Sequence, residues 1–266
     1  MPRFGLIIVG DEILSGKRAD KHLARVIGIL GARGLRLSWA HYVGDDRDAI
    51  TALLRRTFAG DDVVFCCGGI GATPDDHTRQ AAAAALGVDV ELHPEAAELI
   101  TQRCVEMAAE GRGTADMTTP ENRQRLKMGE LPRPARIVPN PFNRIPGFAV
   151  GRHYFLPGFP AMAWPMIEAV LDEGYREHFH REQVAERSMV VFDTAESLVT
   201  PIMEEVEARF PAVRAFSLPS VGDGRDGRVH RRHIELGVKG NPGSIDAAFA
   251  AMRAGIEALG APHEVP

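Results

Sequence analysis

Cysteine is scarce in this chain, with three residues in 266 and no C-x-x-C pair, so the sequence shows neither a disulfide framework nor a cysteine-based metal motif. This scarcity favours a reducing compartment. No apolar run is long enough to span a membrane, and the first one, Leu6–Val9, is too short for the core of a signal peptide. We therefore expect a cytoplasmic protein with no membrane contact.

Positive charge is also in deficit, because the formal net charge is −5. This balance argues against general nucleic-acid binding, which needs a basic surface. A length of 266 residues allows one large domain or two smaller ones. The character of the sequence changes across the charged stretch 178–187, so we expect one domain over residues 1–180 and a smaller α+β domain over 181–266.

Three short apolar strands, each followed by an acidic or glycine-rich turn and then a helical segment, dominate the first domain. The strands cover residues 4–9, 35–43 and 63–67, and the turns are Gly10–Gly16, Gly44–Asp46 and Gly68–Thr78. Strand, turn and helix in this order predict an α/β fold with a mostly parallel sheet. Right-handed crossovers place all three turns at one sheet edge, where open α/β sheets bind ligands.

Further elements follow from periodicity and from turn residues. The run Ala81–Ala85 predicts a helix that ends at Gly87, and Cys66 and Cys67 point to opposite faces of their strand. Residues 148–150 and 153–156 predict a hairpin after an irregular proline-rich stretch over 132–146. The other expected elements are helices over 94–110, 119–128, 160–171, 195–209 and 244–259, and strands over 188–192, 213–218 and 233–238.

The third turn allows two interpretations. Thr73 and Pro74 fit the N-cap and first position of a helix, and Asp76 stands where a capping-box acid stands. In the other interpretation, the glycines leave backbone N–H groups open to a phosphate beside a helix N-terminus. Because Asp75 and Asp76 would repel phosphate, this second interpretation predicts a divalent cation, such as Mg²⁺, between carboxylate and phosphate.

Two nucleotide-binding motifs are excluded. The segment Gly69–Pro74 has proline where a dinucleotide fingerprint requires glycine. The segment Gly10–Lys17 has one residue too many for a P-loop, and Arg18 replaces the required Ser or Thr. Neither a Rossmann dehydrogenase nor a P-loop ATPase follows from these turns.

Taken together, the turns resemble the MoaB/Mog family of molybdopterin-binding domains, and most closely its CinA-like branch. The resemblance covers about residues 4–172, and the matching segments occur in order: Asp11–Gly16 for the acidic turn ending in Leu-x-Gly, Val43–Asp45, Gly68–Thr78 for Gly-Gly-x-Gly-x-Thr-x-Asp-Asp-x-Thr, Pro120 with Asn122 and Arg123, Asn140-Pro141, Pro146–Phe148 and Leu156–Pro160.

The resemblance implies a three-layer α/β/α domain that binds molybdopterin or its nucleotide form. It gives Asp45 and Asp76 as the important acidic pair, here candidate catalytic residues, with Asp76 also a candidate metal ligand. It also implies a phosphate-bearing pterin or nucleotide as partner, and we expect a homo-oligomer. The candidate ligand-binding residues are Asp11, Glu12, Ser15, Gly16, Gly68, Gly69, Gly71, Thr73, Asp75, Thr78, Pro157 and Gly158.

CinA-like relatives are also linked to metal-dependent hydrolysis of nucleotide diphosphates such as ADP-ribose or FAD, which makes a pyrophosphatase the alternative function. The sequence departs from these relatives at Ala161-Met162, where many have Ser-Glu, and at Asn143–Ile145, where many have Gly-Thr-Ala. These changes weaken the pyrophosphatase interpretation more than the binding one. The amidohydrolase domain that many relatives carry is absent, so nicotinamide-nucleotide deamidation is not expected.

Three other features favour structural roles. His178, His180 and Glu182 are too few for a structural metal site and fit a solvated linker. The basic segment Gly222–Arg232, which contains the G-x-x-G of Gly224–Gly227, gives a second alternative function, an interaction or nucleic-acid module, but it fits a solvated hairpin tip better. Cys66 and Cys67 lie on an apolar strand and fit the core better than a nucleophile.

Overall fold

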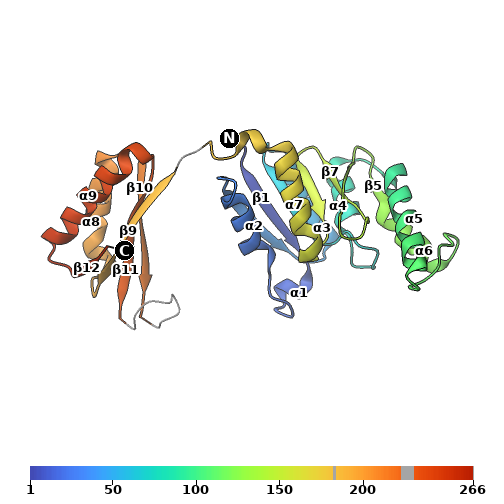
Figure 1. Cartoon of the computed structure of the whole chain (residues 1–266), viewed down its shortest axis with the longest axis horizontal. Helices are drawn as coiled ribbons and strands as arrows, with labels where there is room; N and C mark the ends of the chain where they lie inside the picture. The colour runs from blue at the N-terminus through green and yellow to red at the C-terminus, as the bar shows by residue number, and fades with distance from the viewer. Residues whose placement is uncertain (182–183, 223–230, 266) are drawn as a thin grey trace. The chain divides into compact units, whose positions relative to one another are not determined.

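The computed structural model describes residues 1–181, 184–222 and 231–265. It divides into two compact units, Met1–His180 and Arg181–Pro266 (Figure 1). Within the described residues, no helix combines the length and the apolar character that crossing a membrane requires.

Six strands of the first unit form one sheet in the order β2-β1-β3-β8-β7-β6. Strands β2, β1, β3 and β8 run parallel, whereas β7 is antiparallel to β8 and β6 is antiparallel to β7. The strands of this unit are β1 (Phe4–Val9), β2 (Leu37–Val43), β3 (Val63–Cys67), β4 (Val90–Leu92), β5 (Glu130–Pro132), β6 (Arg136–Val138), β7 (Gly147–Val150) and β8 (His153–Leu156).

Helices cover both faces of this sheet. The central strands β1 and β3 are apolar along their whole length, which favours burial of both faces, and every residue of both strands is buried. One face packs against α2 and α7, and the other packs against α3 and α4. Cys67 belongs to the first core and Cys66 to the second, as the alternation along a strand predicts. The helical elements are α1 (Asp11–Leu14), α2 (His22–Gly31), α3 (Arg47–Phe58), α4 (Thr78–Leu86), α5 (Pro94–Ala109), α6 (Pro120–Leu126), η1 (Lys127–Gly129), α7 (Pro160–Gly174) and η2 (Arg176–His178).

The three-layer α/β/α prediction is confirmed, and so is the hairpin of β7 and β8. Gly87 ends α4 in the left-handed conformation, with φ of 69°, as predicted. The proline-rich stretch is more regular than predicted, since β5 pairs with β4 and β6 extends the main sheet. These strands have three residues each, which is too short for an alternating pattern to show in the sequence.

The second unit is a four-stranded sheet in the order β10-β11-β9-β12, in which every pair of neighbours is antiparallel. Helices α8 and α9 lie side by side and bury one face of it, where Met189, Leu236 and Phe249 meet (Figure 1). The predicted β-α-β-β-α order is confirmed, with a short strand added at the end. The elements are β9 (Ala185–Phe192), α8 (Glu196–Arg209), β10 (Val213–Ser220), β11 (His233–Gly240), α9 (Pro242–Ala258) and β12 (His263–Glu264).

Candidate functional site

A cleft of about 420 Å³ opens where β1, β3 and β8 end and the chain leaves β2, and we call it the main cleft. All three turns that the sequence singled out contribute to it, through Glu12, Asp45 and the segment 68–76. The turn after β8 adds Pro157 and Gly158. The carboxyl ends of the parallel strands therefore meet at one hollow, as the topology requires.

The first two turns are tied together by a reciprocal pair of hydrogen bonds. The backbone N–H of Asp11 donates to Asp45 Oδ2 at 2.9 Å, and the N–H of Asp45 donates to Asp11 Oδ1 at 3.2 Å. Gly44 permits this approach, because a Cβ atom there would lie 2.3 Å from Asp11 Oδ1. The first turn itself forms the short helix α1, which the sequence did not predict.

The third turn does not begin a helix at Thr73, which is a correction to the capping interpretation. Helix α4 begins five residues later, at Thr78, and the segment before it is an irregular turn. Asp76 Oδ2 accepts hydrogen bonds from both the N–H and the hydroxyl of Thr73, so Asp76 closes this turn instead of capping a helix. Thr78 donates its hydroxyl to the carbonyl oxygen of Gly68 and holds the turn from its other end.

The segment Gly68–Thr73, which we call the glycine turn, presents unpaired backbone donors. Gly68 and Gly69 have positive φ values of 111° and 69°, a conformation that favours glycine. In the part of the chain that the structure describes, the N–H groups of residues 69, 70, 71 and 72 donate to no protein acceptor. All four residues line the main cleft. Successive amides without an acceptor favour the binding of an anion.

A buried arginine supports the glycine turn from behind. Arg79 on α4 is 3% exposed and donates to the carbonyl oxygens of Gly71 and Lys127. Burial lowers the pKa of its guanidinium, and within the described residues no carboxylate lies within ion-pair distance of it. Gln124 on α6 donates to the carbonyl oxygen of Ala72. Two residues from other helices therefore fix the conformation of this turn.

The cleft is acidic on one side. Glu12, Asp45, Asp75 and Asp76 line it, and Arg18 is the one cationic side chain among its described lining residues. Burial raises the pKa of Asp45, and the nearby charges of Asp11, Glu12 and Asp75 raise it further, although the N–H of Asp11 acts in the opposite direction.

The raised pKa of Asp45 predicts that its charge destabilises the folded chain at neutral pH. The Asp45 carboxylate takes up a proton at a higher pH in the folded state than in the unfolded state. Its destabilising effect is therefore fully present above the folded-state pKa and is lost as the pH falls through that pKa. We expect Asp45→Asn to raise the free energy of unfolding by about 0.5 kcal/mol at pH 7, the size of one exposed charge interaction. The gain should shrink as the pH falls towards 4, and thermal unfolding across this range measures it.

Asp48→Asn is the matched control for this prediction. Asp48 lies in the first turn of α3, where a negative charge is favourable. Its replacement should lower stability slightly at pH 7. If Asp45→Asn is no more stable than the unmodified chain at pH 7, the charge of Asp45 does not destabilise the folded state.

Most predicted site residues lie together, but four do not line the main cleft. Asp11 and Ser15 line a neighbouring shallow hollow, which Glu12, Asp45 and Asp75 also border. Gly16 lines neither hollow, and Thr78 is buried beneath the glycine turn. The predicted residues that line the main cleft are Glu12, Asp45, Gly68, Gly69, Gly71, Thr73, Asp75, Asp76, Pro157 and Gly158.

The sequence did not predict a second group of residues that line the cleft. The loop over 139–146 contributes Asn140, Asn143 and Ile145, and the start of α7 contributes Phe159 and Met162. The segments Asn140-Pro141 and Pro146–Phe148, which match the family pattern, bracket this loop and were the available signal. Arg18 had no such signal, because its place in the cleft depends on how α1 folds.

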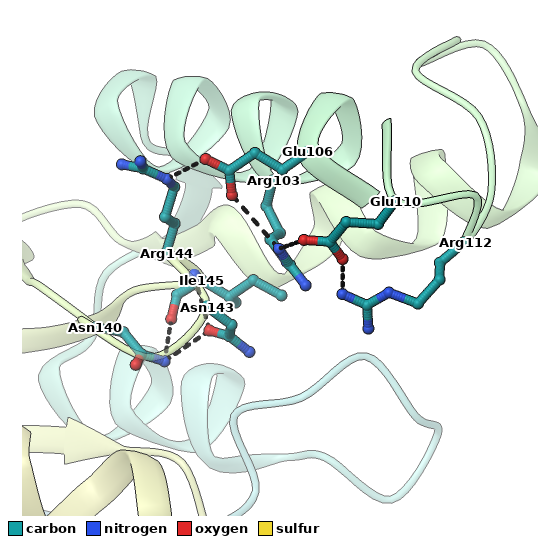
Figure 2. A network of polar contacts seen from close by, with 8 residues as sticks. All are labelled: Arg103, Glu106, Glu110, Arg112, Asn140, Asn143, Arg144 and Ile145. Atoms are coloured by element: carbon teal, nitrogen blue, oxygen red, sulfur yellow. Dashed lines mark hydrogen bonds and ion pairs between the residues drawn. The ribbon is translucent and has the colours of Figure 1, made fainter. Parts of the chain in front are cut away.

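A polar network holds that loop in place (Figure 2). The side chain of Asn140 donates to Asn143 Oδ1 at 2.8 Å and to the carbonyl oxygen of Ile145 at 2.9 Å. Arg144, whose φ is 66°, pairs with Glu106 on α5. The chain of ion pairs continues through Arg103, which lies 3.4 Å from Glu106, so α5 anchors the loop.

The remaining sequence candidates gain no support as sites. Cys66 and Cys67 are buried, and burial raises the pKa of both thiols, that of Cys67 to about 12. Glu182 and residues 223–230, including most of the basic segment, lie outside the described residues. Across residues 1–181, 184–222 and 231–265, no three His, Cys, Asp or Glu side chains are grouped to hold a metal ion. The predicted cation at Asp76 is therefore not supported by a preformed site.

Comparisons with known proteins find similarity over most of the chain. Residues 5–176 match the family described as "Probable molybdopterin binding domain". A CinA-like protein of Anaeromyxobacter sp. strain Fw109-5 is 31% identical over 280 residues, which cover 96% of this chain and 62% of that protein. A protein of Caldivirga maquilingensis is 30% identical over 206 residues, which cover 76% of this chain and 75% of that protein.

A solved structure shares the fold. The CinA protein of Thermoplasma acidophilum, whose function is described as unknown, matches with a TM-score of 0.54 and 29% identity, covering 64% of this chain and 98% of that one. The chain spans less than two thirds of the CinA-like relatives from Anaeromyxobacter and Citrifermentans bemidjiense, with 62% and 39% of their lengths covered.

Proposed function

The chain belongs to the family of probable molybdopterin-binding domains, and from this premise we propose that its main cleft binds a phosphate-bearing pterin, with the phosphate at the glycine turn. Four successive backbone N–H groups support this proposal: those of residues 69 to 72 have no acceptor among the described residues, and all four residues line the cleft. Such a run matches the oxygens of a phosphate.

Arg18 supplies the charge that the turn lacks. It lines the same cleft, and its side chain has no hydrogen-bond or ion-pair partner among the described residues. A guanidinium can bind two phosphate oxygens at once. It also offsets part of the repulsion that Glu12, Asp45, Asp75 and Asp76 exert on an anion.

The carboxylates favour one alternative, a hydrolase for nucleotide diphosphates in the same cleft. Asp45 and Asp76 would then be the catalytic acids, and a divalent cation would be held by the substrate phosphates and by few protein groups, as Mg²⁺ commonly is. Met162 argues for binding over hydrolysis, since it places a thioether at the start of α7 where many relatives have a glutamate.

The proposal is tested by comparing neopterin monophosphate with neopterin in calorimetric titrations of the full chain. We expect the phosphorylated compound to bind at least tenfold more tightly, because a charge-assisted hydrogen bond contributes about 1.5–3 kcal/mol. Equal affinity for the two compounds would contradict a phosphate site. The same titrations with ADP-ribose, with Mg²⁺ or with EDTA, followed by assay of AMP release, test the hydrolase.

Replacing Arg18 tests its role in the cleft. We expect Arg18→Gln to weaken binding of neopterin monophosphate about tenfold, the loss typical of one charged hydrogen bond, and to make the affinity less sensitive to salt. Lys21→Gln is the matched control, because Lys21 is an exposed cation at the start of α2 that does not line the cleft. An equal loss in both variants would mean that general charge, not Arg18, attracts the ligand.

A further inference from the structure

A group of uncharged, largely apolar residues also lines the main cleft, and the phosphate site leaves it unused. Ile145 and Pro146 come from the loop over 139–146, and Phe159 and Met162 come from the start of α7, and we call these four residues the apolar wall. The cleft therefore offers a ligand both polar groups for an anion and an uncharged surface. A ligand that fills both must carry a phosphate and a body that tolerates an apolar contact.

Phe159 is the most exposed aromatic residue of this wall, with 60% of its surface accessible. Among the described residues, no aromatic ring or cation lies close enough to stack on it. Single exposed apolar side chains are common in proteins and need no explanation alone. Here the exposed ring lines a cleft, and its backbone is held in place.

Three contacts fix the backbone that carries this ring. His22 lies 3.0 Å through Nε2 from the carbonyl oxygen of Gly158, just before Phe159. The carbonyl oxygen of Phe159 accepts the N–H groups of Met162 and Ala163 at 3.0 and 2.9 Å, which starts α7. Pro160 follows and restricts the chain further.

The ring and the glycine turn line the same cleft. The backbone just before the ring comes close to this turn, because a Cβ atom added at Gly158 would lie 3.4 Å from the Cα of Gly68. A flat group placed on the ring therefore shares the cleft with the phosphate site.

Asn143 adds a directional polar group to the apolar wall. Its Oδ1 already accepts hydrogen bonds from Asn140 Nδ2 and from the N–H of Ile145, which fixes the orientation of the amide (Figure 2). Its Nδ2 has Met162 Sδ, 3.7 Å away, as its partner. Because a thioether is a weak acceptor, Nδ2 keeps donor capacity for a stronger one.

We propose that Phe159 stacks on a flat, fused-ring heterocycle of the ligand, and that Asn143 Nδ2 donates to a ring carbonyl or ring nitrogen of it. This inference rests on the proposed phosphate site and assigns residues that would bind the ring system of the same ligand. Pterins and purines share this chemistry. The wall thus selects for a ring system in addition to an anion.

The test measures how the variants Phe159→Leu and Phe159→Trp bind two kinds of ligand, one with a fused ring and one without. We expect Phe159→Leu to weaken neopterin monophosphate about tenfold or more, as loss of one stacking contact does, and Phe159→Trp to restore it. Competition by ribose 5-phosphate, which has the phosphate but no fused ring, should be unchanged in both variants. Quenching of pterin fluorescence on binding should fall in Phe159→Leu. AMP in place of neopterin monophosphate shows whether a purine is bound in the same way.

Phe142→Leu is the matched control. Phe142 lies on the loop over 139–146 and is 62% exposed, but it does not line the main cleft. It should bind as the unmodified chain does. Unchanged pterin affinity in Phe159→Leu, with phosphate preference intact, would overturn the stacking role and leave the phosphate site standing. An equal loss of ribose 5-phosphate binding would show that Phe159 only shapes the glycine turn. If the unmodified chain binds no phosphate compound, both proposals are wrong.

Discussion

The Arg79→Met variant is expected to lose both stability and ligand binding. Methionine fills much of the buried space of Arg79 but removes the donor of the Gly71 carbonyl oxygen and one of the two donors of the Lys127 carbonyl oxygen, which also accepts the N–H of Glu130. A polar group left unpaired costs about 1–3 kcal/mol, so we expect a loss of that order in the free energy of unfolding. The released glycine turn should bind neopterin monophosphate at least tenfold more weakly. Urea unfolding and calorimetric titration measure the two effects.

Arg79→Lys separates charge from geometry in this prediction. Lysine keeps the positive charge, but its ammonium is a point charge and lacks the fork that reaches two carbonyl groups. We expect an intermediate loss of both stability and binding. Arg55→Met is the control, because Arg55 is exposed on α3. If Arg79→Met unfolds and binds ligand as the unmodified chain does, Arg79 does not hold the glycine turn in its binding conformation.

Gly71→Ala is expected to reduce binding strongly, with a smaller loss of stability from the hydrogen bonds that Asp76 gives up. The φ of Gly71 is not in the left-handed region, so alanine can adopt its backbone conformation. The added Cβ would lie 2.5 Å from Asp76 Oδ2, so the Asp76 side chain must move away from the hydrogen bonds it accepts from Thr73. Moving this carboxylate opens the turn at its phosphate-binding end. We expect binding of neopterin monophosphate to fall by about tenfold to a hundredfold, the cost of a misplaced positioning group.

Gly174→Ala is the matched control for that variant. Gly174 ends α7, has an ordinary φ, and an added Cβ would meet nothing within 4 Å. It should bind as the unmodified chain does. Undiminished binding in Gly71→Ala, in a chain whose unfolding is also unchanged, would mean that the glycine turn does not hold the phosphate.

The sheet and the edge at which the cleft lies were predictable because their signals are local and repeated. The runs at β1 and β3 are apolar at every position, which is typical of strands buried on both faces, and Gly87 supplies the left-handed end of α4. These features place the turns after β1 and β3 at one edge. The common edge followed from right-handed crossovers and needed no information on side-chain contacts.

The conformation of the third turn was not predictable in the same way. Thr73, Pro74 and Asp76 fit a helix start as well as they fit a hydrogen-bonded turn. The choice between them is made by distant groups, since Arg79 and Gln124 bond the carbonyl oxygens of Gly71 and Ala72. The apolar wall was missed for the same reason, because the loop over 139–146 reaches the cleft only through its anchors on α5.

The phosphate site is tested most directly by titrating the ¹⁵N-labelled chain with neopterin monophosphate and following the chemical shifts of backbone amides. Residues 69, 70, 71 and 72 line the cleft, and their N–H groups, which have no acceptor among the described residues, should show the largest changes. Neopterin without the phosphate should leave these four amides nearly unshifted. Changes confined to other parts of the chain, with these amides unmoved by the phosphorylated compound, would contradict a phosphate site at the glycine turn.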